Sequence, residues 1–247
     1  MFISISKHQV EIEKNRDLWR RKPLLRKIYQ RFYGTIKVRL NPGVTLELGS
    51  GIGQIKTYIP DCITSDLYFN PDIDRVESAY ELSFENLSID NIILFDVWHH
   101  IQYPGAALRE CYRVLAPGGR LIIFEPAMGF IPQIFYRLFH HEPLGVGEGI
   151  EWELPTPTDL PKLNYFAAQS RAWRIFYQGE GASNLKNWAL TECLSWSDFA
   201  YLGSGGFSKP SLYPISLLPY IESLDRLLTR MPKHLFSARM LVVLDKK

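Results

Sequence analysis

The sequence predicts an α/β fold, and three observations lead to this prediction. An apolar, strand-like run at residues 44–48 passes directly into the Gly-Ser-Gly-Ile-Gly sequence of residues 49–53. Asp66 ends the next apolar segment of the chain. The run Ile92–Phe95 is continuously apolar, as in a parallel strand that is buried on both faces. Strands that lead into glycine turns and helices are typical of an open α/β sheet.

The glycine-rich stretch at residues 49–53 also carries information about a ligand. Glycines after a strand let backbone N–H groups approach a bound molecule, and Asp66 at the end of the next strand can bind ribose hydroxyls. The spacing is not that of a dinucleotide site, because the third glycine comes one residue early, and Gly-Lys-Ser/Thr is absent. With Glu47 beside it, the turn suits a cofactor that has an amino group and a ribose but no phosphate. The alternative is a glycine turn without a ligand.

Five motifs in order resemble those of the class I S-adenosylmethionine-dependent methyltransferases. They are Glu47-x-Gly-Ser-Gly-x-Gly53, Thr64–Asp66, Ser78–Phe84, Asn91–Ile101 and Arg113–Phe124. The resemblance is close over 44–127 and looser over 195–247. It implies a Rossmann-like doubly wound sheet of seven strands, mostly parallel with an antiparallel last strand. It also implies S-adenosylmethionine as the cofactor and S-adenosylhomocysteine as its product.

The resemblance further implies which residues bind the cofactor. They lie in the glycine turn, at the ends of the second and fourth strands, and in the segment that contacts adenine. These residues are Glu47, Gly49, Ser50, Gly51, Gly53, Asp66, Leu67, Ser78, Ala79, Tyr80, Phe95 and Asp96. Ser78 stands where the family usually has an acid, which mildly favours weaker contact with the cofactor.

The elements follow in order from local patterns. The expected strands are 44–48, 62–66, a polar one within 72–78, 89–96, 120–124, 208–213 and 238–244. The expected helices are 51–58, 103–115, 135–141, 166–177, 196–202 and 217–228. Helix 103–115 has one apolar face, and Pro117-Gly118-Gly119 turns the chain into the fifth strand. The resemblance places the last strand antiparallel at the sheet edge.

Three regions are expected along the chain. Residues 1–42 should form basic amphipathic helices that cover the site, and 43–247 the methyltransferase domain. Within the domain, residues 127–194 are rich in aromatic residues and should form a helical substrate cap inserted after the fifth strand; a second small core or a dimer surface is the alternative. Residues 7–39 carry 11 Lys or Arg against three acids. This segment is either a lid with a solvated basic face or a contact to an anionic substrate or membrane surface.

Composition limits the class of protein. The net charge of +2 does not favour nucleic acid as a partner, and the three cysteines show no pairing or metal-ligand spacing. No apolar run of about 20 residues that could span a bilayer is present, nor a signal peptide. We therefore expect a cytoplasmic protein without a bound metal.

The predicted reaction is methyl transfer to a small molecule. The acceptor is expected to be a hydroxyl of a glycosidic, lipid-linked or aromatic compound, and a base that removes its proton would help. His99 and His100 are the predicted catalytic residues; His140, His141 and Glu125 are further candidate bases. The alternative is a non-catalytic protein of the same fold that binds a partner through the aromatic insertion. The glycine spacing disfavours a nicotinamide-dependent oxidoreductase.

Overall fold

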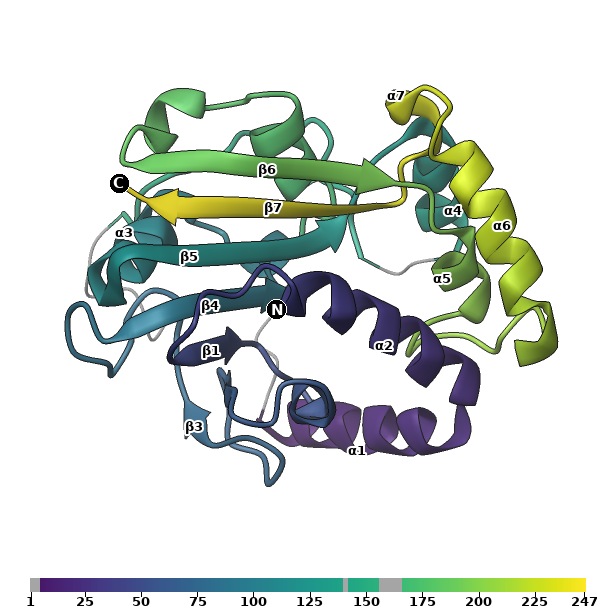
Figure 1. Ribbon diagram of the computed structural model, residues 1–247, viewed down its shortest axis with the longest axis horizontal. Helices are drawn as coiled ribbons and strands as arrows, with labels where there is room; N and C mark the ends of the chain where they lie inside the picture. The colour runs from purple at the N-terminus through teal and green to yellow at the C-terminus, as the bar shows by residue number, and fades with distance from the viewer. Residues whose placement is uncertain (1–4, 140–141, 156–165) are drawn as a thin grey trace.

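The computed structural model describes residues 5–139, 142–155 and 166–247, and these form a sheet flanked by helices on both faces (Figure 1). The strands are β1 (Thr45–Leu48), β2 (Ile63–Asp66), β3 (Arg75–Val76), β4 (Ile89–Phe95), β5 (Leu115–Pro126), β6 (Trp188–Trp196) and β7 (Arg239–Lys246). Their order in the seven-stranded sheet is β3-β2-β1-β4-β5-β7-β6. Only β7 runs against its neighbours, β5 and β6. The predicted fold class is thereby confirmed.

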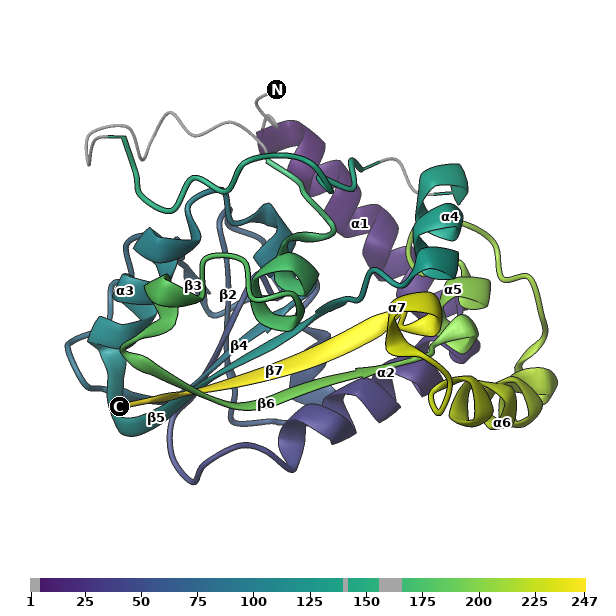
Figure 2. The ribbon, with the colours of Figure 1, turned by 90° about the horizontal axis from the view of Figure 1, so that it is seen from above.

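Helices lie on both faces of this sheet. They are α1 (Ile5–Arg21), α2 (Pro23–Lys37), α3 (Pro104–Val114), α4 (Phe130–Phe139), α5 (Phe199–Ser204), α6 (Leu218–Leu228) and α7 (Lys233–Phe236). Figure 2 shows α2 on one face and α3 on the other. Short helical turns are η1 (Gln54–Thr57), η2 (Trp98–His100), η4 (Trp173–Tyr177), η5 (Ala182–Leu185) and η6 (Ile215–Leu217). No helix in the described part of the chain is both long and apolar enough to cross a membrane.

Strand β4 shows why the core has two halves. Its side chains alternate between the faces: Ile92 and Leu94 pack in the cluster that includes α3, while Ile93 and Phe95 pack in the cluster that includes α2. All four are buried. Burying such a side chain contributes about 1.5–3 kcal/mol relative to leaving it exposed, so both faces of β4 contribute to stability.

The predicted helix at 51–58 is wrong in extent, since only the single turn η1 forms there. Gly51 and Gly53 both adopt positive φ, which an α-helix excludes. Helix α2 covers the sheet on this side instead. Its Phe32 ring lies 4.9 Å from that of Phe124 on β5, and its Tyr29 ring lies 5.2 Å from that of Phe95 on β4.

The predicted sixth strand at 208–213 is also wrong. Strand β6 is Trp188–Trp196, so the last seven residues of the predicted cap belong to the sheet. Residues 208–213 instead form a loop that contains Pro210. Lys22 stabilises the turn before this loop, because its Nζ donates a hydrogen bond to the carbonyl of Gly206 at 2.7 Å. Strand β7 lies between β5 and β6, and β6 forms the edge where we expected β7.

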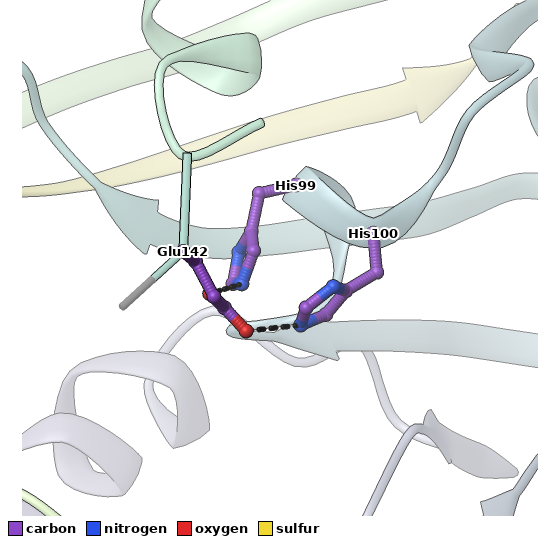
Figure 3. Close-up of side chains that lie close together, drawn as sticks. All are labelled: His99, His100 and Glu142. Atoms are coloured by element: carbon purple, nitrogen blue, oxygen red, sulfur yellow. Dashed lines mark ion pairs between the residues drawn. The ribbon is translucent and has the colours of Figure 1, made fainter. Parts of the chain in front are cut away.

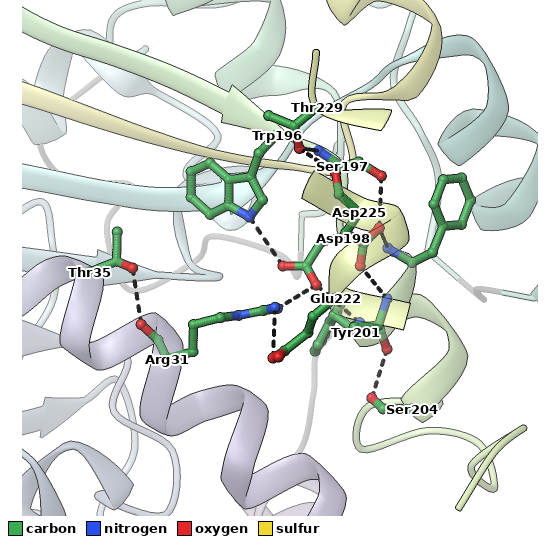
Figure 4. Close-up of polar contacts among 12 residues, drawn as sticks. Arg31, Thr35, Trp196, Ser197, Asp198, Tyr201, Ser204, Glu222, Asp225 and Thr229 are labelled. Carbon is green, nitrogen blue, oxygen red and sulfur yellow. Dashed lines mark hydrogen bonds and ion pairs between the residues drawn. The ribbon is translucent and has the colours of Figure 1, made fainter. Parts of the chain in front are cut away.

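A buried polar cluster joins α2 to the helices at the carboxyl end of β6 (Figure 4). Asp198 precedes α5, and its Oδ1 accepts hydrogen bonds from Tyr201 N at 3.1 Å and from Arg31 Nη2 of α2 at 2.6 Å. Asp225 of α6 accepts from the backbone N of Ala200 at 2.9 Å. Side-chain capping of this kind typically stabilises a helix by about 1 kcal/mol. The cluster therefore fixes α5, which carries Tyr201 to the site described below.

Several basic residues in and beside α1 and α2 bind other parts of the chain. Arg16 pairs with Asp72, Arg31 with Asp198 and Glu222, and the Arg39 side chain contacts Glu192 at 2.9 Å. Lys22 and Arg26 donate to backbone carbonyls. These contacts support the lid interpretation of the N-terminal helices.

Candidate active site

The glycine turn after β1 is built by backbone conformation and by close packing. Gly49, Gly51 and Gly53 have φ values of +71°, +55° and +63°, which glycine adopts without strain. A Cβ on Gly49 would lie 2.3 Å from Cγ2 of Val97, so a side chain has no room there. A Cβ on Gly51 would meet nothing within 4 Å. The turn thus presents bare backbone to open space at Gly51, as a cofactor cradle requires.

Asp66 braces this turn from the end of β2. Its Oδ2 accepts a hydrogen bond from the backbone N of Gly51 at 3.0 Å, and its Oδ1 accepts from Leu67 N at 2.6 Å. The side chain of Leu67 is half exposed. The acid predicted from the sequence is therefore beside the predicted glycines, although the two come from different strands.

Glu47 lies behind the turn. Its carboxylate is buried, at 1% exposure, and Oε1 accepts a hydrogen bond from the Tyr33 hydroxyl of α2 at 3.1 Å. Its Oε2 has no hydrogen-bond partner among the described residues. Burial raises the pKa of Glu47 to about 7, and the nearby charge of Asp66 adds to the rise. A cation at the turn would therefore stabilise the ionised form of Glu47.

A cavity of about 390 Å³ begins at the glycine turn and extends toward the histidines. Among the predicted residues, Gly49, Ser50, Gly51, Phe95, Asp96 and His99 line it. Glu47, Gly53, Asp66, Leu67, Ser78, Ala79, Tyr80 and His100 are not in the described lining. Its volume falls in the usual range for small-molecule sites of about 300–1,000 Å³.

The predicted adenine segment lies outside this cavity. The Ser78 hydroxyl accepts from Tyr80 N at 3.3 Å, which closes a tight turn. The Tyr80 hydroxyl then accepts from Tyr103 N, the residue before α3, at 3.2 Å. Ser78, Ala79 and Tyr80 therefore form a compact turn against α3, and their contact with the cofactor stays a prediction.

Several residues that line the cavity were not found from the sequence. They come from α1, α2, α5 and β7: Glu11, Asn15, Tyr29, Tyr201 and Arg239. Arg16 of α1 is not in the described lining and pairs with Asp72. Tyr29 lies at helical spacing with the other apolar residues of α2, so a local pattern could have identified it. No local pattern in the sequence identifies Arg239 as a residue of the site.

Arg239 and Asp96, which both line the cavity, form an ion pair. Arg239 is fully buried, and both of its terminal nitrogens contact the two carboxylate oxygens of Asp96. Its guanidinium also lies over the Tyr201 ring, 4.2 Å from the centroid. Asp96 has φ +53°, an unfavourable conformation for a residue with a side chain, and such strain is common at functional sites. The bidentate pair holds Asp96 in place at the end of β4.

The paired histidines follow β4 in the turn η2, and each Nδ1 has an acceptor. His99 Nδ1 lies 2.7 Å from Oε2 of Glu125, a buried residue near the end of β5. Burial disfavours the charged ring, but the charge and hydrogen bond of Glu125 outweigh it and raise the pKa of His99 to about 8. His100 Nδ1 donates to the carbonyl of Phe166 at 2.9 Å. Burial and the neighbouring charge of His99 lower the pKa of His100 to about 4.

The other candidate bases are Glu125, His140 and His141. Glu125 supports His99 rather than facing the cavity, because its Oε1 also accepts from Trp98 N at 2.6 Å. His140 and His141 lie outside the described residues. Glu142, which follows them in the chain, lines the cavity.

These residues fit an S-adenosyl cofactor at one end of the cavity. The open backbone at Gly51, the buried Oε2 of Glu47 and the acid at the end of β2 match a cationic ligand with a ribose. No cofactor geometry follows from this fit, but the glycine turn and the histidines share one cavity.

Comparison with known proteins agrees with this fit. Residues 46–123 match the family described as a methyltransferase domain, and a search of curated sequences returns no match. The fold is similar to a S-adenosylmethionine-dependent methyltransferase of Thermotoga maritima, described as a possible histamine N-methyltransferase. The TM-score is 0.53, with 14% identity over 96% of this chain and 99% of that chain. It is also similar to a S-adenosylmethionine-dependent methyltransferase of Archaeoglobus fulgidus, with TM-score 0.51 and 13% identity over 90% and 94%.

At such identities the structural likeness concerns the fold, and the family match covers residues 46–123. Both agree with the motifs quoted from the sequence. Residues 46–123 therefore form a methyltransferase domain, the chain has the fold of S-adenosylmethionine-dependent methyltransferases, and both findings agree with S-adenosylmethionine as the cofactor.

Proposed function

We propose that this protein transfers the methyl group of S-adenosylmethionine to a hydroxyl oxygen of a small molecule, of glycosidic, lipid-linked or aromatic type. The observation that carries the proposal is the position of His99. It lines the same cavity as the glycine turn, and a buried carboxylate holds its Nδ1. An imidazole oriented in this way presents Nε2 for work on a hydroxyl, whereas an amine acceptor requires less help.

The walls of the cavity support a small acceptor with apolar surface. Seven phenylalanine and tyrosine side chains line it: Tyr29, Phe95, Phe135, Tyr136, Phe139, Tyr201 and Phe207. Aromatic walls exclude water and can stack on a sugar or an aromatic ring. The bound cofactor supplies an electrophilic methyl group on a sulfonium. The protein then has to align the acceptor with that methyl group and favour loss of the hydroxyl proton, and His99 and His100 are the residues we assign to this second task.

Lid and cap residues complete the enclosure. Glu11 and Asn15 of α1 line the cavity from the N-terminal side, and the ion pair between Arg16 and Asp72 ties α1 to the loop after β2. Phe135 and Tyr136 of α4 line it from the segment after β5. This arrangement supports the predicted roles of residues 1–42 as a lid and of the segment after 127 as a substrate cap.

Calorimetric titration with S-adenosylmethionine and S-adenosylhomocysteine tests the cofactor half of the proposal. We expect micromolar binding, about −8 kcal/mol, and at least about a tenfold loss for Asp66→Ala. Asp61→Ala, in the exposed loop before β2, is the matched control and should bind as wild type. No detectable binding by the wild type would favour the alternative, a non-catalytic protein that binds a partner through its aromatic insertion.

Transfer of labelled methyl to a panel of acceptors tests the second half. Sugars, lipid-linked sugars and phenols are compared with amines of similar size, and mass spectrometry locates the added methyl group. Methylation on oxygen is the expected result, and it should fall at least about a hundredfold for His99→Gln, in line with loss of a group that assists proton removal. Methylation of amines alone would contradict the proposed acceptor.

A further inference from the structure

We call the part of the cavity that His99 and Glu142 line the acceptor end. There, the imidazoles of His99 and His100 converge on the carboxylate of Glu142 (Figure 3). His99 Nε2 lies 3.6 Å from Oε2 of Glu142, and His100 Nε2 lies 3.8 Å from Oε1 of the same carboxylate. One ligand-type atom from each residue lies within 4.8 Å of the others. The histidines come from η2 after β4, whereas Glu142 comes from the segment after α4, so tertiary structure alone creates this group.

The outer contacts of the two histidines fix their orientation. A carbonyl oxygen only accepts, so the Nδ1 of His100 carries the proton that it donates to Phe166 O. The neutral ring then has its lone pair on Nε2, the atom that faces Glu142. His99 Nδ1 is held in the same way by the buried carboxylate of Glu125. Metal-binding histidines in proteins characteristically use their second nitrogen in these two ways, toward a carboxylate or a backbone carbonyl.

Glu142 is positioned from its other side. Gln169, a buried residue that lines the cavity, donates from its side-chain amide to Oε2 of Glu142. The carboxylate is only 11% exposed, and His99 only 5%. The lone pair of His100 Nε2, the carboxylate of Glu142 and the Nε2 of His99, which gives up its proton when a metal binds, thus surround a position that a cation would stabilise.

We propose that His99, His100 and Glu142 bind one divalent transition-metal ion, such as Zn²⁺, on the acceptor side of the cavity. Bonds of about 2.0–2.2 Å to nitrogen and oxygen place tetrahedral ligand atoms about 3.4 Å apart. The distances of 3.6 and 3.8 Å involve different oxygens of Glu142, and one ligand atom from each residue lies within 4.8 Å of the others. A bound ion would therefore draw these atoms together by up to about 1.4 Å. Imidazole with carboxylate suits Zn²⁺ and its neighbours better than Mg²⁺ or Ca²⁺, which prefer oxygen ligands.

Three protein ligands leave further positions on the ion. A hydroxyl that occupies one of them has its pKa lowered, as water on Zn²⁺ has, and is also fixed in place. This role rests on the proposed function. In it, His99 and His100 act on the acceptor hydroxyl indirectly, by holding the ion that the hydroxyl binds. From the sequence we expected no bound metal, because spacing along the chain gave no sign of Glu142 as a partner of His99.

Metal binding is measured directly, without turnover. Full-length protein is dialysed against a chelator and titrated with Zn²⁺ by calorimetry and with Co²⁺ by visible absorption, which reports the ligand geometry. We expect one equivalent to bind with the d–d bands of a low-coordinate nitrogen–oxygen site. His100→Asn and Glu142→Gln should each weaken binding at least about tenfold to hundredfold. Glu148→Gln, an exposed acid in the same segment, is the matched control and should bind as wild type.

Other outcomes overturn the inference. Absence of stoichiometric Zn²⁺ and Co²⁺ binding contradicts it, as does wild-type affinity in both ligand variants. Circular dichroism melting of each variant establishes that a loss of binding is not a loss of fold. Cofactor titration on the same metal-free samples separates the two proposals: cofactor binding without metal binding refutes the metal site and leaves His99 as a direct base. Metal binding without cofactor binding refutes the proposed function instead.

Discussion

The two ends of the cavity are built in opposite ways. At the cofactor end, Gly49, Ser50 and Gly51 are adjacent in the chain, and the backbone itself forms the surface. At the acceptor end, side chains form the surface, and they come from distant segments: His99 after β4, Glu142 after α4 and Arg239 on β7. A backbone cradle tolerates change in most side chains around it, whereas a group of converging side chains depends on the packing of every element that contributes one.

Charge differs between the ends as well. The cofactor end has a buried acid: the Glu47 carboxylate accepts a hydrogen bond from the Tyr33 hydroxyl, and burial raises its pKa to about 7. At the acceptor end, Asp96 is matched by Arg239 and Glu125 by His99. We therefore expect a cationic ligand at the first end, whereas the second end pairs these charges within the protein.

Removal of Arg239 should have the largest effect. Arg239→Met leaves Asp96 without its bidentate partner, and breaking a buried ion pair costs about 3–5 kcal/mol. Asp96 is partly exposed, so we expect the lower end of this range. Chemical denaturation measures the free energy of unfolding. Arg120→Met breaks an ion pair with Asp245 between β5 and β7, outside the cavity lining, and should cost about 1 kcal/mol or less. Equal losses in both variants would show that the acceptor end has no special dependence on paired charge.

Glu47 should make the stability of the cofactor-free protein depend on pH. The folded protein keeps this proton up to about pH 7, whereas the unfolded chain loses it near 4.5. The unfolded state thus binds fewer protons between these values, and the free energy of unfolding falls as pH rises through this window and levels off above it. At 1.36 kcal/mol per pH unit, the loss is about 3 kcal/mol.

Denaturation of wild type and Glu47→Gln at pH 5, 6, 7 and 8 checks this expectation. The variant lacks the titrating group, so its advantage over wild type should grow with pH up to about pH 7. Saturating cofactor should reduce the pH dependence of wild type, because a cation near the turn favours ionised Glu47. A difference between variant and wild type that stays constant with pH would contradict the assigned charge at this end.

A pair of glycine substitutions tests whether the cofactor end is indeed a backbone surface. Gly51 and Gly118 have φ values of +55° and +73°, and an added Cβ meets nothing within 4 Å at either. Each alanine variant should therefore lose about 1–2 kcal/mol of stability from backbone strain alone. Only Gly51→Ala should also weaken cofactor binding, by about tenfold or more, because its methyl group enters the space above the turn. Calorimetric titration of both variants is decisive: undiminished affinity of Gly51→Ala would place the cofactor elsewhere.

The smallest effect is expected for the lid contact that borders the cofactor end. Arg16 and Asp72 are each more than a quarter exposed, so their ion pair contributes about 1 kcal/mol or less to stability. Arg16→Ala should leave the melting temperature almost unchanged but increase hydrogen exchange in α1, since this pair ties the helix to the loop after β2. Arg21→Ala, whose partner Asp17 lies on the same helix, should leave exchange in α1 nearly unaltered. Equal exchange in the two variants would mean that the pair does not hold the lid.

The sequence alone determined the fold class and the cofactor end. Residues 44–53 and Asp66 form a local pattern in which glycine positions and strand ends fix the geometry, and such patterns can be identified without tertiary contacts. The errors arose where local signals competed. The helix predicted at 51–58 gave way to glycines at positive φ, and the strand predicted at 208–213 was placed by analogy, while the true strand 188–196 has a mixed polar pattern.

Only the tertiary structure determined the acceptor end. The proximity of His99 to Glu125 follows from the pairing of β4 with β5, and Phe95 lies opposite Phe124 in that register. The approach of Glu142 to both histidines, and of Arg239 to Asp96, joins residues 42 or more positions apart in the chain, with no periodicity to announce them. The physical reason is that a backbone turn is specified by its own few residues, whereas converging side chains are specified by the packing of the whole sheet and its helices.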